Sequence, residues 1–172
     1  MTLQINPQEL RSAFGSFLTG VTVVTARRDD GAMVGFTANS FTSVSIDPPL
    51  LLVCPGKFLS SYATFAACTH FAVNILAQGQ QDIANIFASY KGDRFARVAH
   101  RLDQHAVALI EGAAAHFSCT RVQALPMGDH CILIGRVDDF SQSNCAGLGY
   151  HAGQYFRIGF DGVARQDVLE RT

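Results

Sequence analysis

The sequence predicts a mainly β protein, a closed or split β-barrel with three short flanking helices. Short apolar segments with strand-like alternation recur along most of the chain, and glycine, proline or Asp-Gly turns separate them. Helical spacing of apolar residues occurs in only three short stretches. No internal repeat is visible, so we expect a single domain over residues 1–172, with a polar tail from about residue 161.

The first expected element is a helix. Asn6 can cap its start, Pro7 suits the first helical position, and Glu9 completes a capping box. Gly20 is expected to end it. The apolar residues that share one face of this helix are Leu10, Phe14, Phe17 and Leu18.

The remaining elements follow from the same periodicities. Strands are expected at residues 21–26, 33–46, 50–54, 70–76, 107–122, 130–140 and 154–160. Asp30 and Gly31 form a hairpin turn after the first strand, and strands 33–46 and 50–54 are expected to pair. A short helix is expected around Tyr62 and a longer one around Ile86, followed by a long polar loop.

Composition narrows the classes of function. Charged residues make up 16% of the chain and hydrophobic residues 48%, which indicates surface hidden in an oligomer interface or under a ligand. The formal net charge is −1 with no basic run, so neither nucleic acid nor an acidic membrane is an expected partner. No apolar stretch approaches the ~20 residues needed to cross a bilayer, and the N-terminus lacks the pattern of a signal peptide. We therefore expect a cytoplasmic protein.

Cysteine and histidine show no metal-binding or disulfide motif. The five cysteines are odd in number and form no Cys-x-x-Cys pair, so we expect reduced, mostly buried thiols. Cys54 is the exception, because it stands where a strand enters a loop. Four histidines lack the spacing of metal ligands and are expected to be structural or solvated, namely His70, His100, His105 and His116. No metal site is expected.

Two neighbouring segments indicate a ligand site. Small hydroxyl and amide side chains occupy residues 37–40, where a core strand would carry branched aliphatics. Small residues in a strand usually allow a flat or bulky group to approach the backbone. The loop from Cys54 to Ser61 offers Gly56 for close approach, Lys57 for charge and serines at a helix start, which suits a phosphate. An ordinary strand–helix loop with capping serines is the alternative.

The chain carries neither of two common nucleotide-binding motifs. Its nearest match to Gly-x-Gly-x-x-Gly, at residues 147–153, places the third glycine one position too late and is followed by an aromatic strand instead of a helix. The motif Gly-x-x-x-x-Gly-Lys is absent. Any nicotinamide cofactor must therefore bind without a Rossmann domain.

Six segments occur in an order that points to a family. They are residues 20–25, 35–50 and 71–76, Asp93-Arg94-Phe95, Gly128-Asp129-His130, and residues 150–155. Together they resemble the short-chain flavin reductases, an FMN-binding split-barrel family that supplies reduced flavin to two-component flavin-dependent monooxygenases. The resemblance implies a split β-barrel of Greek-key type.

The resemblance also implies where a flavin would bind. The residues expected to contact the isoalloxazine ring are Thr37, Ala38, Asn39 and Ser40. The residues expected around its phosphate are Cys54, Pro55, Lys57, Ser60 and Ser61. Phe87 and Ala88, at the end of the longer helix, are expected to border the flavin.

The implied activity is that of an NAD(P)H:flavin oxidoreductase. Hydride transfer from nicotinamide C4 to flavin N5 needs no protein acid or nucleophile, because the two rings carry the chemistry and the protein holds them stacked. His130 is the candidate residue for positioning the nicotinamide, and His151 and Tyr155 are expected to form walls of the same NAD(P)H site. FMN or FAD, with NADH or NADPH, fit the motifs equally well.

A homodimer and a monooxygenase partner complete the expectation, because an open barrel leaves strand edges that a second copy would cover. Two alternatives stay open. One is a reductase of the same fold with another acceptor, such as cob(II)alamin or a ferric chelate. The other is a flavin- or haem-binding split-barrel protein without turnover.

Overall fold

The computed structural model describes residues 5–157, and the predicted polar tail from about residue 161 lies outside them. The helices are α1 (Pro7–Gly15), α2 (Tyr62–Ala67) and α3 (Gln81–Ser89), with a 3₁₀ turn at Phe95–Arg97. The strands are β1 (Thr19–Gly20), β2 (Thr22–Arg27), β3 (Met33–Ala38), β4 (Thr42–Ile46), β5 (Pro49–Val53), β6 (His70–Ile75), β7 (His100–Leu102), β8 (Ala108–Ile110), β9 (Ala115–Met127), β10 (His130–Gln142), β11 (Leu148–His151) and β12 (Gln154–Arg157). No helix within residues 5–157 is long and apolar enough to cross a membrane.

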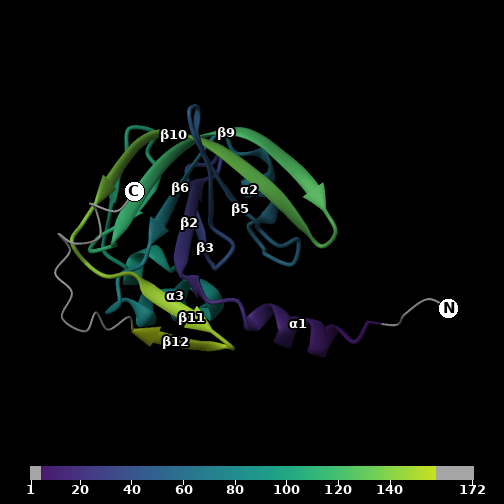
Figure 1. Ribbon diagram of the computed structural model, residues 1–172. Helices are drawn as coiled ribbons and strands as arrows, with labels where there is room; N and C mark the ends of the chain where they lie inside the picture. The colour runs from purple at the N-terminus through teal and green to yellow at the C-terminus, as the bar shows by residue number, and fades with distance from the viewer. Residues whose placement is uncertain (1–4, 158–172) are drawn as a thin grey trace.

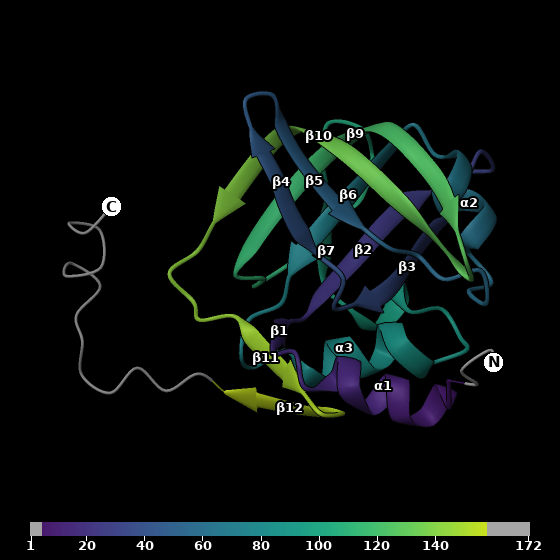
Figure 2. The ribbon, with the colours of Figure 1, turned by 45° about the vertical axis from the view of Figure 1, so that its right-hand side comes forward.

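Seven strands form one antiparallel sheet in the order β3-β2-β6-β9-β10-β5-β4. Figures 1 and 2 show this sheet curled into an open barrel, with α3 and the β11–β12 hairpin at one end. The two smaller sheets are β1-β11-β12 and β7-β8. The predicted mainly β fold of split-barrel type with short flanking helices is confirmed.

The barrel is split because the predicted strand 33–46 breaks at residues 39–41. β3 pairs with β2 and β4 pairs with β5, so the two halves of the expected strand lie at opposite edges of the sheet. The connection is held at Ser40, whose Oγ accepts the N–H of Cys54 at 2.9 Å. The expectation of one continuous strand was therefore wrong, and only its second half pairs with β5.

A turn also interrupts two other segments that were expected to be single strands. Residues 107–122 divide around Gly112, whose φ of 72° separates β8 from β9. The closing segment is a hairpin, because Ala152 and Gly153 adopt φ of 47° and 82° between β11 and β12. The end of the expected strand 154–160 lies outside the described residues.

α1 begins as predicted and ends early. The side chain of Asn6 accepts the N–H of Gln8 at 2.9 Å, which caps the first turn. The helix ends at Gly15 instead of Gly20, because Thr19 and Gly20 pair with β11. The apolar face expected for this helix does not pack into the core, since no residue of α1 is buried.

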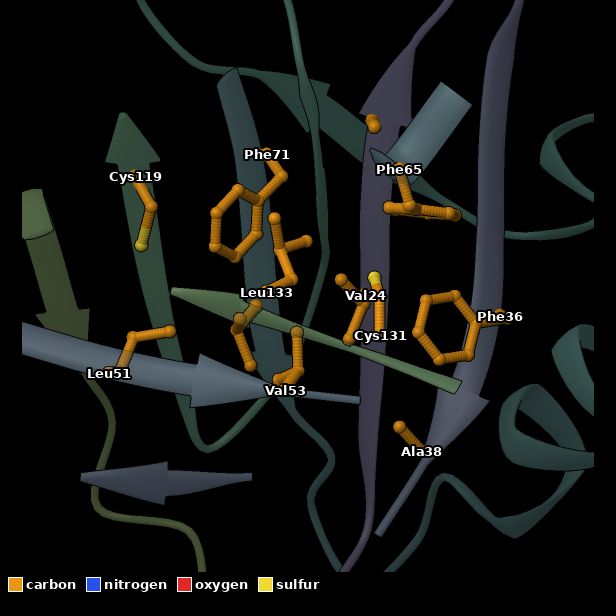
Figure 3. Close-up of a cluster of buried hydrophobic side chains, with 12 residues drawn as sticks. Val24, Phe36, Ala38, Leu51, Val53, Phe65, Phe71, Cys119, Cys131 and Leu133 are labelled. Atoms are coloured by element: carbon orange, nitrogen blue, oxygen red, sulfur yellow. The ribbon is translucent and has the colours of Figure 1, made fainter. Parts of the chain in front are cut away.

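The hydrophobic core lies on both faces of the sheet. Along β2, Val24 belongs to a cluster inside the barrel and Val23 to a cluster beneath α3, as the alternation of a strand requires. The barrel cluster contains Phe36, Phe65 and Phe71 (Figure 3).

Asn74 is a fully buried polar residue on the interior strand β6, with 0% exposure. Its Nδ2 donates to the carbonyl of Val23 at 2.9 Å, and its Oδ1 accepts the N–H of Ile110 at 2.8 Å. One amide therefore joins β6 to β2 and to β8. The Val23 carbonyl also lies in the β2–β6 ladder, whereas the buried N–H of Ile110 depends on the Asn74 side chain for its partner.

We expect Asn74→Ala to lower the free energy of unfolding by about 1–3 kcal/mol, because the buried N–H of Ile110 loses its partner. Denaturant unfolding measures this loss. The matched control is Asn85→Ala at an exposed position of α3, which should change stability by no more than about 0.5 kcal/mol. Equal stability of the two variants would show that the bridge contributes nothing.

Candidate ligand-binding site

The open edge of β3 is the feature from which the site is built. β3 ends the sheet, so one side of its backbone has no strand partner. The carbonyl of Gly35 accepts Nη1 of Arg94 at 2.7 Å on this open side. Since the N–H and C=O of one residue in an antiparallel strand point the same way, the backbone groups of Gly35 and Thr37 face away from β2. Two hollows border this strand.

The smaller hollow has a volume of about 230 Å³ and lies beside the end of β3. Its lining residues are Val21, Thr37, Ala38, Asn39, Ala88, Tyr150 and Tyr155. Five of these were predicted from the sequence, and the structure brings them together from three separate elements and the residues that flank them. None of the seven lining side chains is a carboxylate, an imidazole or a thiol.

Side-chain contacts fix the walls of the smaller hollow. Thr37 Oγ1 donates to the carbonyl of Ala84 at 2.6 Å, which ties β3 to α3. The rings of Tyr150 and Tyr155 lie 5.4 Å apart on the β11–β12 hairpin. Burial raises the pKa of the Tyr155 phenol, and the neighbouring Tyr150 raises it further. The Tyr155 phenol therefore stays neutral at physiological pH, and both rings form walls of the hollow.

Phe87 is one predicted site residue that lines neither hollow. It is 1% exposed and packs in the core beneath β3, whereas its neighbour Ala88 lines the smaller hollow. Phe87 explains the glycine at residue 35, because a Cβ there would lie 2.7 Å from the Phe87 ring. Phe87 thus supports β3 from behind, without an accessible surface for a ligand.

The larger hollow has a volume of about 600 Å³ and runs along the start of β3. Its lining residues are Arg28, Ala32, Met33, Val34, Gly35, Ser60, Ser61, Gly92, Asp93, Arg94, Phe95, Ala96 and His100. Ser60 and Ser61 were predicted here within the first turn of a helix, but α2 begins at Tyr62, so both serines precede it. Ser61 makes no side-chain cap to α2, which counts against the alternative of a purely capping serine.

The segment after α3 closes the larger hollow. Arg94 donates to the carbonyls of Tyr90 and Gly35, so this part of the expected polar loop is tied to β3. Asp93 Oδ1 accepts the N–H groups of Phe95 and Ala96, which starts the 3₁₀ turn. The motif Asp93-Arg94-Phe95 thus fixes the segment after α3 against the edge of β3.

The loop from Cys54 to Lys57 is bound to the turn that precedes β10. The N–H of Lys57 donates to the carbonyl of Asp129 at 2.8 Å, and Lys57 Nζ donates to the carbonyl of Gly128 at 2.6 Å. The carbonyl of Pro55 accepts a hydrogen bond from the N–H of Cys131, at the start of β10. Cys54 is half-buried, and this burial raises the pKa of its thiol.

His130 lies at this junction and does not line the smaller hollow. Its Nδ1 is 2.7 Å from Oδ1 of Asp129, and its ring meets the edge of Phe58 with the centroids 5.7 Å apart. The hydrogen bond and charge of His130 lower the pKa of the Asp129 carboxyl. His151 is exposed at the end of β11. The predicted nicotinamide residues therefore divide into two places, with only Tyr155 in the hollow.

Sequence reasoning missed Val21 and Tyr150 in the smaller hollow and Arg28 in the larger one. The alternation of β11 carried a weak signal for Tyr150, which pairs directly with Tyr155. Arg28 carried none, because it and Ser60 line one hollow only in the folded chain.

Known proteins share this architecture. A family model described as flavin reductase like domain matches residues 14–159. The reductase component of a flavin-dependent trigonelline monooxygenase from Acinetobacter baylyi is 54% identical over 149 residues, which are 87% of this chain and 48% of that protein. A monooxygenase reductase subunit, HsaB, from Mycobacterium tuberculosis is 38% identical over 83% of this chain and 75% of its own length.

A solved structure agrees with these relatives. An NADH:FAD oxidoreductase from Streptomyces globisporus, in complex with NAD and FAD fragments, superposes with a TM-score of 0.86 at 37% identity, covering 92% of this chain and 98% of that one. A probable flavin reductase from Rhizobium meliloti is 46% identical, and 55% of its length is covered. The chain thus spans about half the length of the Acinetobacter and Rhizobium relatives. The expected resemblance is confirmed, and the chain belongs to the flavin reductase like domain family.

Proposed function

We propose that this chain catalyses the NAD(P)H-dependent reduction of FMN or FAD and supplies the reduced flavin to a partner flavin-dependent monooxygenase. The observation that carries the proposal is the open edge of β3, where small residues leave backbone groups exposed beside two hollows. A bound flavin would supply hydride acceptance at its N5. The chain has only to hold two flat rings in contact, which agrees with a small hollow lined by no carboxylate, imidazole or thiol.

The residues present fit a flavin. The N–H and C=O of Thr37 are free to bond the polar edge of an isoalloxazine ring, and Ala38 leaves space against its face. The hydroxyls of Ser60 and Ser61 border the larger hollow and would bind the phosphate. Lys57 is already bonded to Gly128, so it would contribute positive field and not a direct contact.

Cys54 and Pro55 would hold the loop that borders the flavin, without contacting the flavin directly. Each uses a backbone group to hold the loop, Cys54 through Ser40 and Pro55 through β10. Asn39 and Ser40 would close the ring end of the site at the break between β3 and β4. We place the nicotinamide between Tyr155 and the flavin, with His130 and His151 at its outer margin.

The relatives support this activity. Their names describe reductase components of flavin-dependent monooxygenases and an NADH:FAD oxidoreductase. A further relative, from Agrobacterium fabrum, is named an FMN reductase that uses NADH. Because the names include both FAD and FMN, we propose either flavin for this chain.

We propose a homodimer whose interface includes α1. Phe14 and Phe17 are 70% and 76% exposed, and Leu18 is 56% exposed. Exposed apolar side chains gathered on α1 and on the segment that follows it mark an interaction surface. Figure 1 shows α1 outside the barrel, where a second copy could reach it.

We further propose one flavin reductase domain and a cytoplasmic location. The cysteines in the described residues are free thiols. Burial raises the pKa of Cys68 to about 11 and that of Cys119 to about 12, so these two stay protonated. Unpaired thiols agree with a reducing compartment.

The proposed activity is tested by the loss of NADH and NADPH absorbance in the presence of FMN, FAD, riboflavin, cob(II)alamin or a ferric chelate. We expect oxidation with the flavins. Flavin binding without nucleotide oxidation would identify a binding module. Oxidation with only cob(II)alamin or the chelate would identify a reductase with another acceptor.

We expect Ala88→Leu to weaken flavin binding at least ~10-fold, about 1.4 kcal/mol, because a branched side chain would fill the smaller hollow. Ala88 is exposed, so the fold should be retained. Flavin fluorescence reports binding without indole interference, since the chain contains no Trp. Ala63→Leu, at an exposed position on α2, is the control. Unchanged affinity in Ala88→Leu would remove the ring from this hollow.

We expect His130→Ala to raise KM for NADH or lower kcat, with flavin affinity close to wild type, because the imidazole would touch the nicotinamide and not the flavin. A change in KM alone would report lost binding, and a fall in kcat would report misaligned rings. Parallel loss of flavin and NADH binding would instead assign His130 to the structural junction with residues 54–57.

We expect sedimentation analysis to give twice the 18.6 kDa mass of one chain. The double variant Phe14→Asp/Phe17→Asp should give single chains, because charge on α1 and on the segment that follows it opposes burial. Ile46→Asp, at a residue 90% exposed on β4, is the comparison. Dissociation by Ile46→Asp and not by the α1 variant would place the interface on the β4 edge.

A further inference from the structure

We propose that His70, His105 and Asp138 bind a divalent transition-metal ion of the zinc class, at a site separate from both hollows along β3. Each residue offers one ligand atom, and these atoms all lie within 4.8 Å of one another. His105 Nε2 is 3.7 Å from Asp138 Oδ2. This inference is independent of the proposed flavin chemistry, and it differs from the sequence-based expectation of no metal.

The fold assembles this set from three distant segments. His70 begins β6, His105 lies in the turn before β8, and Asp138 lies on β10. No pair of them has the local spacing of a metal motif, which is why the sequence did not reveal the cluster. Two imidazoles and a carboxylate are the donors that zinc and related borderline ions prefer.

The two imidazole rings are stacked, with centroids 3.7 Å apart and planes within 4° of parallel. Imidazole binds a metal through a lone pair in the plane of the ring, so one ring must turn for both nitrogens to reach one ion. The His105 side chain is 26% exposed and sits on a turn, which leaves it room to move. Metal binding would therefore break the stacking of the His70 and His105 rings.

A second layer of residues already orients the donors. Thr120 Oγ1 donates to Asp138 Oδ2 and lies 3.3 Å from Nδ1 of His70. Arg136 Nη2 donates to the other carboxylate oxygen of Asp138 at 3.1 Å. Asp103 Oδ1 accepts the N–H of His105 at 2.8 Å and so fixes the turn. Hydrogen-bonded ligands of this kind are typical of protein metal sites.

The cluster is open to solvent. His70 and His105 line a hollow of about 620 Å³ beside α2 and the β2–β3 turn, in which neither Ser60 nor Ser61 takes part. An ion could enter from this hollow, and water could complete its coordination, as at zinc sites with three protein ligands.

The test is calorimetric titration with ZnCl₂ in a Cys145→Ser background, which removes the exposed thiol as a competing ligand. We expect one Zn²⁺ per chain. His105→Ala should abolish this binding, and Thr120→Val, which keeps the shape and removes the hydroxyl, should weaken it by about 10–100-fold. His151→Ala, which removes an exposed imidazole elsewhere, should bind as the background protein does. Visible absorption of the Co²⁺ complex provides a second readout, and circular dichroism verifies the fold of each variant.

Zinc binding that survives both His105→Ala and Thr120→Val unchanged would overturn the proposal. So would the absence of saturable binding by the background protein. Loss of binding in His151→Ala alone would move the site to the β11–β12 hairpin, with the same consequence.

Discussion

The structure depends on the separation of two strands that are neighbours in the sequence. β3 and β4 are joined by only three residues, yet they form opposite edges of a seven-stranded sheet. The hydrogen bond between Ser40 and Cys54 holds the crossing point and fixes where the loop to α2 starts. The open edge of β3, both hollows and the position of Ser60 follow from this separation. The proposed flavin site thus lies at a gap in the barrel itself.

An open strand needs support from its buried side if it is to present fixed backbone groups to a ligand. α3 supplies this support: Thr37 bonds the carbonyl of Ala84, and the Phe87 ring packs where residue 35 has no side chain. Arg94 reaches back to Gly35 from the segment after α3. These contacts preorganise β3, so little conformational entropy remains to be lost on binding.

Local signals in the sequence predicted much of this arrangement. The Asn6 cap, the turn at Gly31 and the small residues of β3 each depend on near neighbours, and each was found. The early end of α1 was not predicted, because it depends on pairing with β11, about 130 residues away along the chain. Arg28, Tyr150 and the grouping of His70 with His105 were not predicted either, because they too depend on contacts between distant segments. The burial of Phe87 was missed because helical periodicity does not distinguish a core position from a ligand wall.

The unpaired edge of β3 has a consequence for the handling of the protein. A row of free N–H and C=O groups is a template for a strand from another molecule, so edge-to-edge association competes with ligand binding. Arg94 blocks one acceptor of this row, at Gly35, and a bound flavin would cover the groups around Thr37. The ligand would therefore also protect the protein from aggregation, and preparations depleted of flavin would be the ones most prone to precipitate.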